Sequence, residues 1–132
     1  MQGDLIFDEK GRITGRRVLD ATTMEVSFEA RTKVKGTTEG VNIGTYTTTM
    51  MPDGSMYGQG QGFVMTNDGQ MISWKGNGIG KFVSQDKIRY TGAIFLSTQS
   101  KGSLASLNNV VVIFEHEGDM EGNISSKGWE WK

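Results

Sequence analysis

The stretches SMYGQGQGFVMT, residues 55–66, and QMISWKGNGIGKFV, residues 70–83, each carry glycine at every second position. Successive side chains of a β-strand point to opposite faces, so each glycine triplet strips the side chains from one face of a strand. Glycine inside a strand marks a sharp bend, a barrel corner or the close approach of another group. The two neighbouring stretches therefore predict a small, strongly curved β-barrel.

The rest of the chain divides into similar alternating segments joined by short turns. In residues 24–35, apolar and polar side chains alternate, which is typical of a half-buried strand. Glycine, proline, asparagine and aspartate punctuate the segments and predict chain reversals. We expect turns at Glu9-Lys10-Gly11, Pro52-Asp53-Gly54, Asn67-Asp68-Gly69 and Ser84-Gln85-Asp86.

Three-residue loops at the last three turns fix the strand register. The predicted pairs are Tyr46–Gly60, Trp74–Gly62, Tyr90–Gly80 and Gly78–Gly92. All of these residues fall on one face, and the opposite face carries glutamine, lysine and arginine. Independent strands thus agree on which side meets water, which supports the assignment. Large aromatic side chains set against glycines are how a small barrel fills its taper.

About eight strands in sequential antiparallel order leave two unpaired edges, which closure of the sheet removes. We therefore predict an all-β fold with one domain, residues 1–132, in a closed antiparallel up-and-down barrel of about eight strands, a layout that lipocalins share. The interior of such a barrel is either filled by side chains or holds one small ligand.

Composition excludes several functional classes. The chain has no cysteine, which excludes disulfide bonds and thiolate chemistry. Its formal net charge is −1, and acidic residues interrupt the basic ones near the N-terminus, so we expect no nucleic-acid partner. No apolar run approaches the roughly 20 residues that span a bilayer, and the N-terminus lacks a signal-peptide pattern. We expect a cytoplasmic protein without a membrane partner.

A ligand pocket is predicted where large side chains share the inner face with glycines. Such a site combines apolar bodies with a few polar tips. The glycine stretches lie inside strands rather than before a helix, so they do not fit nucleotide-binding loops and we expect no cofactor. A packed core with locally satisfied hydroxyl groups is the alternative. The candidate ligand-binding residues are Phe28, Tyr46, Met50, Trp74, Tyr90 and Ile94.

His116 is the single histidine, so a multi-histidine metal site is excluded and we expect no metal. Its segment has mixed character on both faces, and a histidine at the barrel rim is one interpretation. If His116 faces the lumen with Glu130, the two residues are candidates for acid–base catalysis. If Glu115 and Lys127 face inward instead, they form a buried ion pair or supply a catalytic carboxylate.

The terminal residues Trp129 and Trp131 predict that the last strand pairs with the first. Their indole rings then bury area against the core or against a neighbouring subunit, or they form the aromatic wall of a ligand pocket. A subunit contact would make the protein a homo-oligomer.

The chain resembles small uncharacterised prokaryotic proteins that are grouped with the allene oxide cyclase and dirigent barrels. The likeness runs from about Gly11 to Lys132 and lies in the strand order and four motifs: Gly44-Thr45-Tyr46, GQGQG at 58–62, W-x-G-x-G-x-G at 74–80 and GWEWK at 128–132. It implies an eight-stranded barrel, often oligomeric, that holds a hydrophobic small molecule. The cyclases' pocket carboxylate and polar partners do not map onto positions of this chain, so catalysis is not carried over.

Three functional hypotheses follow. The first is a barrel that binds a small apolar ligand. The second is a cofactor-free cyclase or isomerase that holds a reactive substrate in a productive conformer, with Glu115, His116 or Glu130 as the acid or base. The third is a structural or assembly protein with Trp129 and Trp131 at a subunit interface. The glycines of the inner face favour a cavity, and the sequence discriminates weakly among the three.

Overall fold

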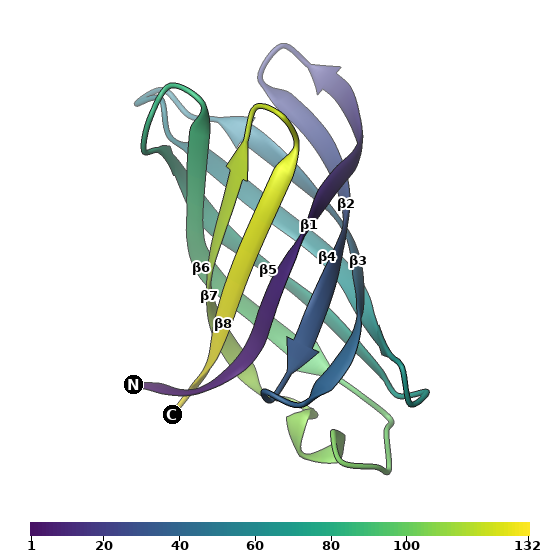
Figure 1. Ribbon diagram of the computed structural model, residues 1–132. Coiled ribbons are helices and arrows are strands. Elements are labelled where there is room, and N and C mark those ends of the chain that lie inside the picture. The colour runs from purple at the N-terminus through teal and green to yellow at the C-terminus, as the bar shows by residue number, and fades with distance from the viewer.

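The computed structural model describes residues 1–132 as eight β-strands and one short 3-10 helix. The elements are β1 (Gln2–Asp20), β2 (Thr23–Val34), β3 (Thr38–Met50), β4 (Met56–Thr66), β5 (Met71–Phe82), β6 (Lys87–Ser97), η1 (Ala105–Leu107), β7 (Val111–Asp119) and β8 (Asn123–Trp131). Each strand pairs antiparallel with the next, and β8 pairs with β1, so the sheet closes on itself (Figure 1). The predicted closed up-and-down barrel is confirmed. No helix of the chain has the length and apolar character needed to cross a bilayer.

The registers of the three predicted hairpins are confirmed as well. Tyr46 lies opposite Gly60, Trp74 opposite Gly62, Tyr90 opposite Gly80 and Gly78 opposite Gly92. Two of the connecting turns contain glycines with φ of +86° and +87°, at positions 54 and 69. This left-handed conformation is one that glycine adopts without the penalty of a Cβ atom.

The turn expected at Glu9-Lys10-Gly11 is wrong, because β1 runs through these residues without a break. Gly11 pairs with Ala30 of β2 on one side and with Ile124 of β8 on the other. A Cβ atom on Gly11 would lie 2.0 Å from the carbonyl oxygen of Glu29. The glycine therefore permits close approach of two strands within the barrel wall. Because β1 continues through this region, the side chain of Glu9 faces the interior.

The alternating glycines of β4 and β5 are required by contacts of two kinds. A Cβ atom on Gly76 would lie 2.1 Å from the carbonyl oxygen of Ala93 on the next strand. A Cβ atom on Gly80 would lie 2.6 Å from the ring of Tyr90. Both distances are shorter than any ordinary contact, so side chains at these positions are incompatible with the curved wall and with the rings that fill the barrel.

One end of the barrel is closed by the loop that connects β6 to β7. Leu104 and Leu107 of this loop are buried in the main apolar cluster, and Figure 1 shows η1 at the end where both termini lie. The side-chain oxygen of Gln70 accepts a hydrogen bond from the Leu104 N–H at 3.0 Å. At the opposite end the inward positions Met50 and Phe82 are 54% and 56% exposed. Solvent therefore reaches the interior side of the wall at that end.

Candidate functional site

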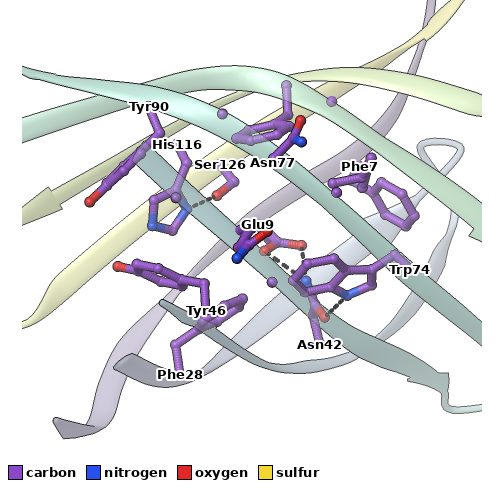
Figure 2. A pocket seen from close by; sticks show the side chains of 18 of the residues that line it. Phe7, Glu9, Phe28, Asn42, Tyr46, Trp74, Asn77, Tyr90, His116 and Ser126 are labelled. Atoms are coloured by element: carbon purple, nitrogen blue, oxygen red, sulfur yellow. Dashed lines mark hydrogen bonds between the residues drawn. The ribbon is translucent and has the colours of Figure 1, made fainter. Parts of the chain in front are cut away.

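The barrel lumen contains a cavity of about 100 Å³. One wall is formed by β4 and β5 where Gly58, Gly60, Gly76 and Gly78 contribute no side chain. Six aromatic rings form a large part of the remaining wall, and Figure 2 shows several of them. The rings that line the cavity are those of Phe7, Phe28, Tyr46, Trp74, Tyr90 and Phe114. A concave, mainly apolar space with few polar groups is the usual form of a small-molecule site.

The aromatic rings contact one another around His116. The centroids of Phe28, Tyr46 and Tyr90 lie 6.0 to 6.1 Å from the centroid of the imidazole ring. Tyr46 and Tyr90 meet edge to face at 5.8 Å, and Phe28 stacks on Trp74 at 6.2 Å. These separations are typical of favourable aromatic pairs. Three of these rings surround the imidazole, and Trp74 extends the group through its contact with Phe28. We call Phe28, Tyr46, Trp74 and Tyr90 the aromatic sleeve.

Glu9, Ser126 and His116 occupy one row across three neighbouring strands. Glu9 of β1 lies directly opposite Ser126 of β8, and Ser126 lies directly opposite His116 of β7. All three residues line the cavity (Figure 2). Neighbouring strands are about 4.8 Å apart, so the Cα atoms of Glu9 and His116 are separated by roughly 10 Å. Two ionisable groups thus flank a hydroxyl group on one wall of an apolar cavity.

Glu9 is the one carboxyl group that lines the cavity, and it is 6% exposed. The Nδ2 group of Asn42 donates hydrogen bonds to both of its oxygens, at 3.1 Å each, and none of the ion pairs of the chain includes it. Burial raises the pKa of Glu9 to about 7, because removal from water disfavours the charged form more than the hydrogen bonds from Asn42 favour it. Both protonation states of Glu9 are therefore populated near neutral pH.

His116 is buried, and its two ring nitrogens differ in their surroundings. Nδ1 lies 2.5 Å from Oγ of Ser126, whereas Nε2 has no hydrogen-bond partner. Burial lowers the pKa of His116 to about 4, so the imidazole is neutral at pH 7. When Nδ1 carries the proton it donates to Ser126, and Nε2 then presents a free lone pair. An unpaired polar atom in the interior costs about 1–3 kcal/mol, and a ligand atom that pairs with Nε2 removes this cost.

Five of the six residues predicted to bind a ligand line the cavity: Phe28, Tyr46, Trp74, Tyr90 and Ile94. The expectation that Met50 lines the same space is corrected. Met50 has the inward orientation of its strand, but it is the last residue of β3 and is 54% exposed at the barrel end that solvent reaches. Strand parity predicted the face correctly and did not predict the height along the barrel axis.

Of the three residues considered as an acid or base, only His116 reaches the cavity. The interpretation of His116 as a rim residue is therefore wrong. Glu115 points outward and pairs with Arg89 at 2.5 Å, both side chains being more than 40% exposed. The predicted inward ion pair of Glu115 with Lys127 is also wrong, because these residues face each other on the outer surface.

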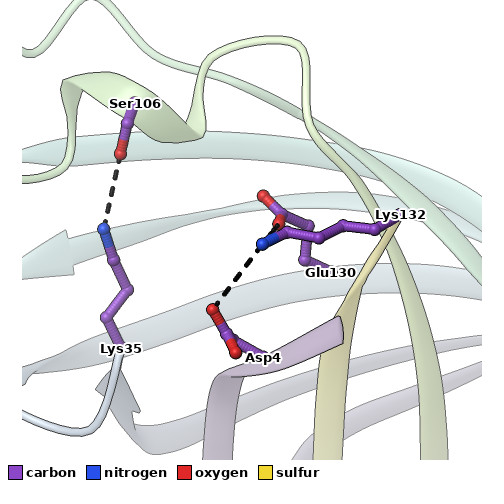
Figure 3. A network of polar contacts seen from close by, with 5 residues as sticks. All are labelled: Asp4, Lys35, Ser106, Glu130 and Lys132. Atoms are coloured by element: carbon purple, nitrogen blue, oxygen red, sulfur yellow. Dashed lines mark hydrogen bonds and ion pairs between the residues drawn. The ribbon is translucent and has the colours of Figure 1, made fainter. Parts of the chain in front are cut away.

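Glu130 lies at the closed end of the barrel, where the two termini meet. Its carboxylate pairs with Lys132 at 3.4 Å, and Lys132 also approaches Asp4 at 3.9 Å (Figure 3). A second contact in the same region joins Lys35, between β2 and β3, to Ser106 of η1 at 3.4 Å. These contacts lie at the end of the barrel and do not line the cavity.

The two terminal tryptophans also lie outside the cavity. The last strand pairs with the first as predicted, with Trp129 opposite Leu5 and Trp131 opposite Gln2. Trp129 is half-buried and Trp131 is 55% exposed. Neither indole ring forms part of the lumen wall.

Three inward polar residues of the cavity, Glu9, Asn42 and Ser126, were not predicted from the sequence. Gln59, Asn77 and Lys127 also border the cavity, from positions that alternate with the inward ones. Glu9 was assigned to a turn, although Phe7, Glu9 and Gly11 alternate with charged residues as in a continuous strand. That alternation is the signal that would have placed Glu9 inside. The structure holds no group of three or more His, Cys, Asp or Glu side chains arranged to bind a metal ion.

Comparison with known proteins identifies the fold. No protein-family model matches the chain, and no curated protein matches it in sequence. The solved structure of a β-barrel-like protein from Acinetobacter baumannii AYE superposes with a TM-score of 0.81, at 13% identity over 99% of this chain and 96% of that one. A protein of unknown function from Clostridium acetobutylicum ATCC 824 gives 0.80, at 13% identity over the full length of both chains. An enzyme from Penicillium herquei gives 0.58, at 16% identity over 98% of this chain and 96% of that one. At these identities the likeness concerns the barrel fold alone.

Proposed function

We propose that this protein binds a small, mainly apolar molecule in the barrel lumen, with one polar atom of the ligand hydrogen-bonded to Nε2 of His116. The proposal rests on one observation: a cavity of about 100 Å³ lies among aromatic rings and contains a buried imidazole nitrogen without a partner. Well-packed interiors leave few voids larger than a water molecule, and buried polar atoms are nearly always paired. A ligand in the cavity satisfies both tendencies.

The size of the cavity limits the ligand. A cavity of about 150 Å³ in another protein accommodates benzene, so the cavity of about 100 Å³ in this barrel corresponds to a molecule of roughly four non-hydrogen atoms when no side chain moves. A larger ligand requires side chains of the aromatic sleeve to change rotamer. The sleeve favours a planar or ring-shaped molecule, because aromatic faces and edges make their best contacts with such groups.

The assignment to the allene oxide cyclase type of barrel is part of this proposal. It is supported by the closed order of eight antiparallel strands and by the glycine and tryptophan motifs of β4, β5 and β8. The inward glycines support a lumen site too, because they keep side chains out of the space between the aromatic sleeve and the opposite wall.

Pyrrole and furan provide a matched pair of probes for the site. Both are five-membered rings of five non-hydrogen atoms, but only pyrrole carries an N–H group that can donate to the lone pair of Nε2. We expect both rings to shift the amide resonances of residues that line the cavity in a two-dimensional NMR titration, with pyrrole binding about 3–10-fold more tightly through the extra hydrogen bond.

Two variants make this titration decisive. His116→Phe keeps a ring inside the sleeve and removes Nε2, so the preference for pyrrole is expected to disappear while furan still binds. Ile94→Phe adds volume to the cavity wall and is expected to weaken both probes. Absence of resonance shifts with either ring at millimolar concentration would refute the lumen site. A preference for furan would place the proton on Nε2 and contradict the assigned hydrogen bond.

We also propose that the barrel self-associates through the outer surface of β3, β4 and β5. Val41, Met65 and Met71 are consecutive cross-strand neighbours there, and Phe63 lies beside them. All four side chains are between 36% and 55% exposed. Contiguous exposed apolar side chains are typical of protein–protein contacts. Light scattering on the wild type and on Met65→Lys tests this: a monomeric wild type would contradict it.

A further inference from the structure

The cavity contains two proton-exchanging groups that face the same space from different strands. Glu9 and His116 stand on either side of Ser126 in one cross-strand row, and all three line the cavity. Neither group takes part in an ion pair, since the four ion pairs of the chain involve other residues. A carboxyl group and an imidazole that are held apart without contact are both free to act on a third molecule between them.

His116 has the features of a base. Ser126 engages Nδ1 at 2.5 Å, which fixes the ring, and Nε2 is buried without a partner. The centroids of three rings, Phe28, Tyr46 and Tyr90, lie 6.0 to 6.1 Å from the imidazole centroid and surround it with largely apolar surface. The Nε2 lone pair, which no protein group uses, is available for a C–H or O–H proton of a bound molecule.

Glu9 has the features of an acid. It is 6% exposed, and Asn42 donates to both of its oxygens. The Asn42 amide is itself fixed by a hydrogen bond from the Trp74 indole at 2.8 Å. Burial favours the protonated form of Glu9, whose pKa is raised to about 7. Two titratable groups whose surroundings favour their neutral forms, one an acid and one a base, are the arrangement that proton-transfer enzymes use.

We propose that the lumen catalyses proton shifts in small enolisable ketones, with Glu9 acting at the carbonyl oxygen and His116 at carbon. This inference rests on the proposed binding of a small molecule in the lumen. Both residues line the same cavity, so a molecule bound there contacts the carboxyl group and the imidazole together. Because the cavity volume is about 100 Å³, a ring of six non-hydrogen atoms enters when side chains of the aromatic sleeve change rotamer.

The reaction of a β,γ-unsaturated ketone balances without a further reactant. Nε2 of His116 takes a proton from the carbon between the carbonyl and the alkene, and the C–H electron pair becomes a new C=C bond. The carbonyl π pair takes the proton of the Glu9 carboxyl group, which gives a dienol, an imidazolium and a carboxylate. The imidazolium then returns its proton to the γ-carbon while the Glu9 carboxylate recovers the enol proton. The product is the conjugated ketone, and both residues return to their starting forms.

The experiment uses the full chain with 3-cyclopentenone, a ring of six non-hydrogen atoms, and follows its conversion to 2-cyclopentenone by proton NMR. Cyclopentanone, which cannot isomerise, measures binding separately by saturation-transfer NMR. We expect isomerisation above the rate in buffer with equimolar imidazole. Glu9→Gln and His116→Phe are each expected to lower kcat/KM about 100-fold or more, while both still bind cyclopentanone.

The control is Glu117→Gln, which removes a carboxylate from the outer face of the same strand as His116 and is expected to change kcat/KM by less than about twofold. Thermal melts establish that each variant is folded. If cyclopentanone binds and 3-cyclopentenone does not react, the catalytic inference is wrong and the binding proposal stands. If the conversion persists in Glu9→Gln and His116→Phe, the assignment of these residues is wrong. If neither ketone binds, both proposals fail together.

Discussion

The indole nitrogen of Trp74 donates a hydrogen bond to Oδ1 of Asn42 over 2.8 Å, and this contact decides which way the amide faces. Because Oδ1 accepts from the indole, Nδ2 is directed at Glu9 and donates to both carboxyl oxygens. The three residues belong to β5, β3 and β1, none of which pair with one another. These hydrogen bonds therefore link β1, β3 and β5 across the lumen and fix the position of the Glu9 carboxyl group.

Replacement of Asn42 by aspartate tests the role of these hydrogen bonds. The new carboxylate still accepts from Trp74, but it removes the donor from Glu9 and places two acidic groups together. We expect Asn42→Asp to lower the free energy of unfolding by about 3 kcal/mol at pH 8. The loss should be much smaller at pH 4.5, where both groups are protonated. Urea unfolding at the two pH values measures the difference.

A suitable comparison is Asn67→Asp, at an exposed asparagine in the turn between β4 and β5 that does not line the cavity. Surface substitutions of this kind change stability by about 0.5 kcal/mol or less. An equal loss at both pH values for Asn42→Asp would show that the amide serves packing and not the Glu9 carboxyl group.

Glu9 and His116 give stability opposite slopes with pH. The pKa of Glu9 is about 7 against an ordinary 4.5, so the folded state holds this proton more tightly, and the stabilisation is complete below pH 4.5 and lost as the pH rises through 7. The pKa of His116 is about 4 against an ordinary 6.5, so stability is lost as the pH falls from 6.5 through 4. In the wild type the two slopes offset each other between pH 4.5 and 6.5.

Two single variants separate the two contributions to the free energy of unfolding. Glu9→Gln retains the titration of His116, so its free energy of unfolding should rise by about 3 kcal/mol from pH 4 to 6.5. His116→Phe retains the titration of Glu9, so its free energy of unfolding should fall by about 3 kcal/mol from pH 4.5 to 7. Urea unfolding at intervals of half a pH unit measures both curves. Parallel curves for the two variants and the wild type would mean that neither group is buried as described.

Most of the fold could be predicted because its signals are local. Alternation gave the inner faces of β2 to β6 but not those of β1, β7 and β8, and the turn residues around Gly54 and Gly69 set the registers of two hairpins. The error at Glu9 and Gly11 has a physical cause: glycine beside charged residues predicts a turn, yet here the glycine allows neighbouring strands to approach. The local signal of the continuous strand is the alternation of Phe7, Glu9 and Gly11 with charged residues, which the turn assignment overlooked.

The site was predicted in part for the same reason. The aromatic sleeve follows from strand parity, which the sequence carries. The hydrogen bonds of Asn42 to Glu9 and Trp74 join strands that are distant in sequence, and their existence depends on the diameter of the barrel. Asn42 also lies between the apolar residues Val41 and Ile43, so its own strand presents apolar side chains outward and a polar one inward. Because this arrangement is the reverse of the usual apolar-inward alternation, Asn42 was not predicted to line the cavity.

The interior glycines provide a test of the curved wall. Gly76→Ala would place a Cβ atom 2.1 Å from the Ala93 carbonyl oxygen, and backbone cannot yield as a flexible side chain would. We expect a loss of about 3 kcal/mol or more, or failure to fold. The matched control is Gly15→Ala in β1, where no atom lies within 4 Å of the added Cβ; it should leave the thermal midpoint nearly unchanged. Equal behaviour of the two variants would contradict the close strand approach.

A double-mutant cycle measures the hydrogen bond between the Tyr90 and Thr48 hydroxyl groups, which are 2.7 Å apart and buried. Tyr90→Phe and Thr48→Val each leave one hydroxyl unpaired in the barrel wall, so each should cost about 1–2 kcal/mol. The double variant leaves no unpaired group and should cost less than the sum of the two, with a coupling energy of about 1 kcal/mol. Thr23 and Thr49, whose hydroxyls meet at 3.2 Å in a part-buried pair, should show a weaker coupling, because water replaces their partners when either is removed. Additive losses at Tyr90 and Thr48 would mean that the Tyr90 hydroxyl finds another partner, and the lumen would then be wetter than its aromatic lining indicates.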